Sequence, residues 1–353
     1  MRRRDFITLV SGAAVTWPLG TLGAPTLQAL LTGPANFVAA GIVPASPVLG
    51  TPTQGISGIV AAYAPPPQTK NQFFRSAVDG SGQYQLITDP ANDYTYPDWS
   101  PANAKLVFCK QTSAAMQLVT CNVDGSNQQV LIPTGLNQLP FWQPNNPANV
   151  LFFTFDASNV GHLKLVNVNT LVVTDLWPGD PYYNIMGSFS PDGTKIAYTS
   201  NRAASGQMLV WIANFDGSNQ IQISATAATY PGSNPALPIS QKVPRWSPDG
   251  QYIAHWEGIE MDYLGGTPNQ DQLIQNSWTV YVVKVADGTR TVAGHGDDPI
   301  WSPDGRLSRA YGDPAIGGVN FQIMVNPYDV SSWTRLMITP NNISNSGSYC
   351  WLR

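Results

Sequence analysis

Charged residues are scarce in this sequence, and the short motifs of the common enzyme classes are missing. Lys, Arg, Asp and Glu make up 11% of the 353 residues, where roughly a quarter is usual for soluble domains. The chain contains no Gly-x-Ser-x-Gly, no Walker-type phosphate loop and no His-Glu-x-x-His. These absences exclude the nucleophile elbow of α/β-hydrolases, a P-loop nucleotide site and a zincin metal site.

Cysteines are also rare, and none forms the Cys-x-x-Cys pair that zinc sites use. Cys109 and Cys121 flank a candidate hairpin turn near Ala115, so they could face each other across two strands. A disulfide between them would form in an oxidising compartment. The alternative is two buried free thiols that pack as small hydrophobic groups. Cys350 is expected to be buried and unpaired.

The chain carries no excess of positive charge. Its formal net charge is −4, and its basic residues form no stripe. A mildly acidic protein of this kind argues against a nucleic acid as the partner.

A repeated turn is what the sequence has in abundance. Trp246-Ser247-Pro248-Asp249-Gly250 lies between two apolar runs. Pro presets φ for the turn, and Gly takes the φ > 0 position without steric cost, so the flanking runs are predicted to form a hairpin. Related segments start at aromatic anchors that recur every 43 to 57 residues: Trp99, Trp142, Phe189, Trp246, Trp301 and, as a partial copy, Trp351.

A second turn falls between successive anchors. Each copy is an Asp-Gly pair after an apolar, β-rich run, at Asp79-Gly80, Asp124-Gly125, Asp216-Gly217 and Asp287-Gly288. Asp-Gly is among the strongest hairpin signals. Each repeat therefore holds four short strands, and four strands at a period of roughly 40–50 residues indicate a β-propeller.

The Trp-Ser-Pro-Asp-Gly copies resemble the WD40-like (PD40) repeats of TolB-type propellers over about residues 56–353. The resemblance implies an all-β, six-bladed propeller with four-stranded blades. The first β-run, 58–63, has no anchor strand before it, and the last anchor has no strands after it. We therefore expect the C-terminal strand to complete the first blade and close the ring. The resemblance implies little about activity, because such propellers serve in scaffolds, binding proteins and enzyme accessory domains.

The N-terminus resembles a twin-arginine export signal. Arg2-Arg3-Arg4-Asp5-Phe6-Ile7 precedes an apolar run that Gly12, Pro18 and Gly20 interrupt, which makes it a poor membrane span. We expect residues 1–23 to be the signal, 24–56 a Pro/Ala/Gly-rich linker and 57–353 the propeller. The expected location is periplasmic or secreted, with no transmembrane span after leader removal. The alternative is a basic tail without a targeting role.

Candidate binding residues cluster in the connections that are predicted to be long. In a propeller the Pro-Asp-Gly and Asp-Gly turns share one face, and the other connections gather on the opposite face, where function tends to reside. Aromatic rings beside carboxylates suit a sugar, a docked peptide or a cation. The candidates are Tyr94, Tyr96, Tyr182, Tyr183, Trp256, Glu257, Asp262, Tyr263, Asp297, Asp298 and Tyr311. The alternative is that the acidic residues are merely solvated and that the tyrosines cap the blade ends.

A metal site is a weaker hypothesis. Some propeller enzymes, oligogalacturonate lyases and lactonases among them, hold a metal near the central channel. His255 and His295, with Glu257 and Asp297, could form such a cluster, although their spacing does not require it. We therefore predict no cofactor, with a divalent cation at the channel mouth as a possibility, and we identify no catalytic residue.

Three functions are compatible with these observations. The first is an exported, non-catalytic binding propeller that presents its long-loop face to an envelope or extracellular protein or peptide. The second is a carbohydrate-active propeller, either a metal-dependent lyase or hydrolase or an oligosaccharide binder, with its site at the channel mouth. The third is a subunit of an extracellular assembly, which the low charge and the many Asn and Thr residues would suit.

Overall fold

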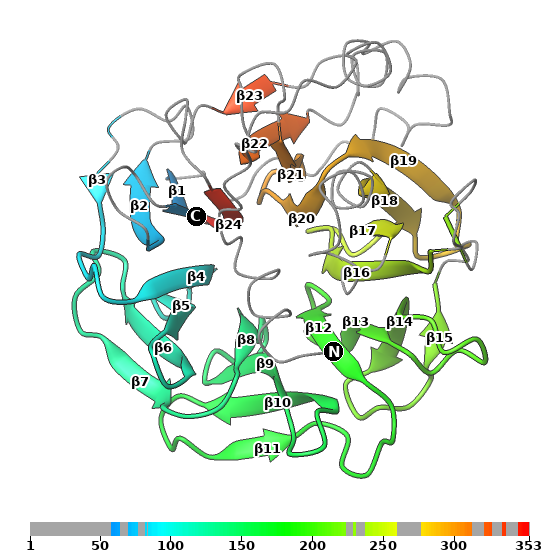
Figure 1. The fold of residues 1–353 in the computed structure, drawn as a ribbon, viewed down its shortest axis with the longest axis horizontal. Coiled ribbons are helices and arrows are strands. Elements are labelled where there is room, and N and C mark those ends of the chain that lie inside the picture. Colours follow the sequence, from blue (N-terminus) through cyan, green and yellow to red (C-terminus); the bar gives the residue numbers. More distant parts are fainter. Residues whose placement is uncertain are drawn as a thin grey trace.

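The computed structural model describes residues 58–63, 70–76, 82, 84–223, 229–230, 237–259, 277–312, 321–326, 334–336 and 345–352. Their strands form six antiparallel four-stranded sheets. Figure 1 shows these sheets arranged radially around a central axis. The chain is thus an all-β propeller with four-stranded antiparallel blades, as the repeats predicted.

Apart from β24, the strands of the first three sheets lie in the N-terminal half of the chain. Sheet 1 contains β24 (Asn345–Leu352), β1 (Gly58–Tyr63), β2 (Gln72–Ser76) and β3 (Tyr84–Gln85). Sheet 2 contains β4 (Asp93–Ser100), β5 (Lys105–Gln111), β6 (Met116–Asn122) and β7 (Gln129–Ile132). Sheet 3 contains β8 (Gln138–Trp142), β9 (Asn149–Phe155), β10 (Gly161–Asn167) and β11 (Val173–Asp175).

The remaining three sheets repeat the same order. Sheet 4 contains β12 (Asn184–Phe189), β13 (Lys195–Ser200), β14 (Leu209–Asn214) and β15 (Ile221–Gln222). Sheet 5 contains β16 (Ile239–Trp246), β17 (Tyr252–Ile259), β18 (Thr279–Lys284) and β19 (Arg290–His295). Sheet 6 contains β20 (Asp297–Trp301), β21 (Leu307–Gly312), β22 (Phe321–Asn326) and β23 (Thr334–Leu336).

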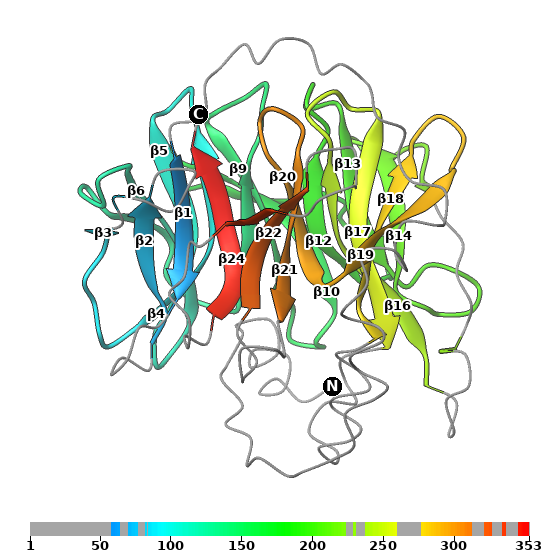
Figure 2. The same cartoon turned by 90° about the horizontal axis from the view of Figure 1, so that it is seen from above.

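The first strand of each sheet lies nearest the axis. In Figure 1 these inner strands are β24, β4, β8, β12, β16 and β20, and each contacts the next around the ring. The expected pairing of the C-terminal strand with the first β-run is confirmed, because β24 runs antiparallel to β1 with Trp351 opposite Ile59. Figure 2 shows β24 standing beside β1 in the side view.

The two predicted turn types define one face of the ring, which we call the short-turn face. It is formed by the connections between first and second strands and between third and fourth strands. The Ser-Pro-Asp-Gly turns close with backbone hydrogen bonds, such as Gly250 N to Ser247 O at 2.9 Å, and Asp249 accepts from the amide of Gln251 at 3.0 Å. We call the opposite face the long-loop face.

The Asp-Gly turn of sheet 2 shows why glycine is needed there. Gly125 has φ +81°, a conformation that favours glycine. A Cβ at this position would also collide with the backbone oxygen of Leu86 in the preceding connection. The turn therefore lets two neighbouring repeats pack closely at the short-turn face.

All six inner strands show a shift in pairing register that the sequence did not predict, and in five of them the shift has the same form. The pairing register shifts between Thr95 and Asp98 in β4, and equivalent shifts occur in β8, β12, β16 and β20. In each case the residue three positions before the anchor aromatic has a positive φ: Tyr96, Leu139, Met186, Val243 and Asp298. Bulges bend a strand and redirect its side chains. Because the bulge recurs in these strands, it is a feature of the propeller wall and not of one site.

The proposed disulfide between Cys109 and Cys121 is wrong. All three cysteines are free and buried. Cys109 pairs with Leu118, whereas Cys121 pairs with Leu106, so the two thiols lie three register positions apart, about 10 Å along the strands. This separation is too long for a disulfide. The two side chains also belong to different hydrophobic clusters, and burial raises the pKa of both thiols.

No helix among the residues described above is long and apolar enough to cross a membrane.

Candidate functional site

Several predicted site residues lie on strands and not on long loops. Tyr94 and Tyr96 are in β4, Trp256 and Glu257 in β17, Asp297 and Asp298 in β20, and Tyr311 in β21. The strands extend farther than the turn signals indicated. Tyr182 and Tyr183 do lie in a connection. Asp262 and Tyr263, and the side chain of Tyr311, lie outside the described residues.

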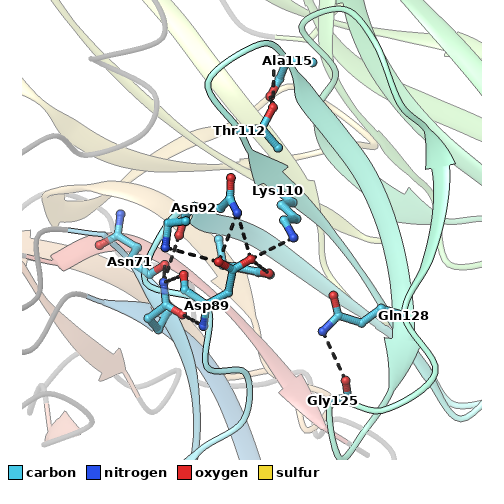
Figure 3. A network of polar contacts seen from close by, with 11 residues as sticks. Asn71, Asp89, Asn92, Lys110, Thr112, Ala115, Gly125 and Gln128 are labelled. Carbon is cyan, nitrogen blue, oxygen red and sulfur yellow. Dashed lines mark hydrogen bonds and ion pairs between the residues drawn. The ribbon is translucent and has the colours of Figure 1, made fainter.

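Tyr94 forms part of the framework on the long-loop side. Its ring is fully buried and packs edge-on against Phe73, with centroids 5.6 Å apart. Its hydroxyl donates to Asp89 at 2.8 Å, and Lys110 forms an ion pair with the same carboxylate at 2.8 Å. Figure 3 shows Asn92 and Lys110 converging on Asp89. The Lys110 ammonium holds the pKa of Asp89 well below its usual range, so this carboxylate is neutralised within the fold.

Tyr182 belongs to a different cluster on the long-loop face, between sheets 3 and 4. Its ring is 42% exposed, and the Arg202 guanidinium lies over it, 5.4 Å from the centroid. Arg202 donates to Asp180 at 2.7 Å and to Asn184 Oδ1 at 2.7 Å. Tyr183 is partly buried, and its amide donates to Asn201 at 3.0 Å. The exposed ring therefore rests on a cation that internal acceptors hold in place.

Trp256 and Glu257 are internal residues of sheet 5. Trp256 is 3% exposed and packs against Trp278 in the core, with centroids 5.4 Å apart. Glu257 forms a 2.7 Å ion pair with Arg290 and accepts from Gln241 Nε2 at 3.0 Å. Neither side chain is presented to a partner, because strand β17 turns both of them into the protein.

Neither of the two histidines proposed as metal ligands is exposed, and His295 is partly buried. His255 is fully buried, and its ring stacks on Tyr281 at 5.9 Å. Burial, together with the nearby Arg290 charge, lowers the pKa of His255 to about 4. Burial likewise lowers the pKa of His295 to about 4. Among the described residues, no three His, Cys, Asp or Glu side chains converge as a metal site requires. Nothing in these strands therefore supports the metal hypothesis.

Tyr96 and Asp298 lie in the central channel, where they line a cavity of about 110 Å³. The wall comes from inner strands on several sides of the ring, including Asp98 of β4, Phe141 of β8 and Arg245 of β16. Trp99, Trp301, Trp351 and Pro303 also line it. These residues follow the bulges and lead toward the Ser-Pro-Asp-Gly turns. The cavity thus lies in the half of the channel nearer the short-turn face, away from the long loops where a site was expected.

Arg245 crosses the channel from sheet 5 to sheet 3. Its guanidinium lies over Phe141, 4.3 Å from the ring centroid, and donates to Pro244 O at 3.0 Å. Burial lowers its pKa to about 10, while the charges of Asp298 and Asp98 act in the opposite direction. The side chain is therefore a cation near neutral pH, flanked by two carboxyl groups.

The carboxyl groups of Asp297 and Asp298 are perturbed by this setting. Burial raises the pKa of both, and the Asp298 charge raises that of Asp297 further, whereas Arg245 lowers that of Asp298. Perturbed carboxyls beside a cation in a concave pocket are a common feature of functional sites. The prediction that Asp298 lines a site is compatible with this geometry, although the binding role itself stays a prediction.

Four buried polar atoms in the cavity wall have no hydrogen-bond partner within the described structure: Tyr96 Oη, Trp99 Nε1, Arg245 Nε and Trp351 Nε1. Most buried polar groups in proteins are paired, so each exception needs an explanation. The sequence pointed to Tyr96 but missed Arg245 and Trp351. The sequence did contain a signal for the cavity wall. The position just before the anchor aromatic supplies a wall residue in four repeats: Asp98, Phe141, Arg245 and Ile300.

Comparisons with known proteins bear on the fold. No family model matches the sequence, and no curated protein is significantly similar to it in sequence. TolB from Acinetobacter baumannii is similar in structure with a TM-score of 0.63 and 15% identity, over 84% of this chain and 66% of that one. A chain of Kuenenia stuttgartiensis hydrazine synthase gives 0.62 and 13%, over 85% of this chain and 47% of that one.

A third similar structure is a chain of a nidogen/laminin complex, with a TM-score of 0.58 and 7% identity, over 84% of this chain and 98% of that one. This protein spans less than two thirds of the TolB chain and about half of the hydrazine synthase chain. At such identities the likeness shows the fold alone. The TolB-type propeller fold that the repeats implied is thereby confirmed.

Proposed function

We propose that this chain is an exported, non-catalytic propeller that binds a protein or peptide partner on its long-loop face. In this proposal, residues 1–23 act as a twin-arginine signal, 24–56 as a linker and 57–353 as the propeller. The six sheets are then the six blades of one ring, which β24 closes. The protein would work in the periplasm or outside the cell, without a cofactor.

The exposed Tyr182 ring is the observation that carries this proposal. Tyrosine and arginine are enriched among the few residues that dominate binding energy at protein interfaces. Here the Arg202 guanidinium under the ring is already fixed by Asp180 and Asn184. The Arg202 side chain that supports the Tyr182 ring is therefore ordered before a partner binds. Pre-organisation of this kind increases affinity.

The state of two carboxylates on the long-loop side of the ring also favours binding over catalysis. Asp89 is paired with Lys110, and Glu257 with Arg290. Carboxylates that are committed to internal cations are poor general acids or bases. The Asp89–Lys110 pair does hold the connection before β4 in place, as a docking surface requires.

Site-specific crosslinking would test the proposal. The mature protein would carry a photo-reactive phenylalanine at position 182 or, as a control, at position 84, since Tyr84 is similarly exposed (49%) but lies on β3 of sheet 1. We expect position 182 alone to capture an envelope protein. With that partner purified, Tyr182→Ala should weaken binding by at least about tenfold, and Tyr84→Ala by less than about twofold. Equal effects of the two substitutions, or no partner at micromolar concentration, would contradict the proposal.

Export can be tested separately. We expect the intact chain in the periplasm or medium and an Arg3→Lys/Arg4→Lys variant in the cytoplasm. An unchanged distribution of this variant would contradict the role of residues 1–23.

Membership of an extracellular assembly is favoured by one observation. Val173, the first residue of the outermost strand of sheet 3, is 44% exposed, and Leu171 and Val172 just before it are 44% and 59% exposed. Apolar groups at an exposed sheet edge are prone to pair with another chain. Size-exclusion chromatography that shows only monomer at every concentration would count against it. The carbohydrate-active alternative gains no support from the described residues, among which no three His, Cys, Asp or Glu side chains converge as a metal-dependent site requires.

A further inference from the structure

The channel cavity is independent of the proposed partner surface, and its size limits what can occupy it. A volume of about 110 Å³ corresponds to three or four waters at roughly 30 Å³ each, and a cavity of about 150 Å³ is known to hold benzene. A ligand of roughly four to six non-hydrogen atoms fits this space.

The wall offers more hydrogen-bond donors than the protein uses. Arg245 Nε, Trp351 Nε1 and the Tyr96 hydroxyl are buried donors without a partner among the described residues. All three side chains are more than nine-tenths buried, and burial keeps the Tyr96 phenol protonated by raising its pKa. An unpaired buried donor costs about 1–3 kcal/mol, so the wall favours an occupant that presents an acceptor oxygen.

The charges on the wall disfavour an ionic occupant. Asp98 and Asp298 line the same cavity as Arg245, and both act electrostatically on its guanidinium. The positive charge is thus already compensated, and an incoming carboxylate or phosphate would stand beside two carboxyl groups. An incoming cation would meet Arg245 itself. A neutral occupant avoids both penalties.

The same carboxyl groups supply acceptors for an occupant that also donates. Asp98 Oδ2 accepts from the amide of Trp142 at 2.8 Å, which fixes its orientation, and Asp298 faces the cavity from β20. The aromatic walls, such as Trp99 and Trp301, suit a flat group. The occupant should therefore be small, planar and neutral, with one acceptor oxygen and N–H donors in the same plane.

We propose that this cavity is a binding site for a small free carboxamide, whose carbonyl oxygen accepts from the Tyr96, Arg245 and Trp351 donors and whose NH₂ group donates to the Asp298 carboxyl. The site would be separate from the Tyr182 surface, so the two proposals can fail independently.

Acetamide, acetate and acetone are matched probes, because they share one shape and differ in charge and donors. Binding would be followed through the indole N–H signals in ¹⁵N-correlated NMR spectra of the mature protein. Trp351 reports on the cavity. Trp177 is the internal control, because its indole donates to Phe215 O in another part of the ring. We expect acetamide to shift the Trp351 signal saturably, at least about fivefold more tightly than acetate or acetone, and to leave Trp177 unmoved.

Two tyrosine variants test the assigned contact. Tyr96→Phe should weaken acetamide binding by about fivefold or more, whereas Tyr94→Phe, whose hydroxyl donates to Asp89 outside the cavity, should leave it within about twofold. Tighter binding of acetate, equal binding of the three probes, or no shift of Trp351 would overturn the proposal. The ranking of the probes uses the unmodified chain, so it remains decisive if a variant fails to fold.

Discussion

On the long-loop side of the ring, three carboxylates that are buried or partly buried each meet a cation. Asp89, Asp180 and Glu257 contact Lys110, Arg202 and Arg290 at 2.8, 2.7 and 2.7 Å. In the channel, Tyr96, Arg245 and Trp351 carry buried donors without a partner in the described part of the chain. The first arrangement stabilises the connections between strands. The second costs stability, and proteins retain such costs mainly where function needs them.

We expect the largest loss of stability from removing one partner of an internal ion pair. Arg290→Ala would leave Glu257, 10% exposed as a side chain, as an uncompensated charge in the protein, and this typically costs about 3–5 kcal/mol. Lys284→Ala is the matched control, since Lys284 and Asp287 are 46% and 50% exposed and such pairs contribute about 0–1 kcal/mol. Urea unfolding would measure both.

Arg290 also stacks on Tyr281, 3.5 Å from the ring centroid, so the charge needs its own test. The double variant Arg290→Ala/Glu257→Gln should recover part of the loss by removing the stranded carboxylate. A loss no greater than that of Lys284→Ala would show that this ion pair is no part of the stabilising framework.

An acid-sensitive effect of intermediate size is expected at His255. Its folded pKa, about 4, lies below the ordinary value of about 6.5. As the pH falls, the unfolded chain therefore takes up the proton first. The stability associated with neutral His255 is fully present above about pH 6.5 and is lost as the pH falls toward 4, by up to about 3 kcal/mol.

The difference between wild type and His255→Gln isolates this effect, because Asp297 and Asp298 titrate in the opposite sense in the same window. The unfolding free energies of the two proteins should differ at pH 7 and should be closer together at pH 4.5. A difference that is independent of pH would contradict a neutral buried His255.

The fold followed from the sequence because its signals are local. Pro248-Asp249-Gly250 and Asp124-Gly125 each fix a turn through the φ angles of two or three residues, and regular repetition of such turns leaves few architectures. The pairing of the Trp351 strand with β1 also followed, since an unmatched strand at each end of a repeat array is most simply satisfied by pairing.

The site was only partly predictable because it depends on contacts between distant repeats. The bulge that gives Tyr96 its positive φ has no marker residue, and Val243 at the equivalent position is β-branched, which that conformation disfavours. Arg245 meets Phe141 only when the ring closes. The Cys109–Cys121 bridge failed because proximity across a hairpin was inferred without the register, which separates the two thiols.

The smallest effect gives the most direct test of the central claim, that the network around Asp89 is paired whereas the channel cavity holds donors without a partner among the described residues. Tyr94 and Tyr96 lie two residues apart in β4, both buried, and Tyr→Phe removes one hydroxyl from each. Tyr94→Phe loses a hydrogen bond to the Asp89 carboxylate and should lower the unfolding free energy by about 1.5–3 kcal/mol. Tyr96→Phe removes an unpaired hydroxyl and should leave the stability unchanged or raise it. Equal losses from the two substitutions would contradict the account.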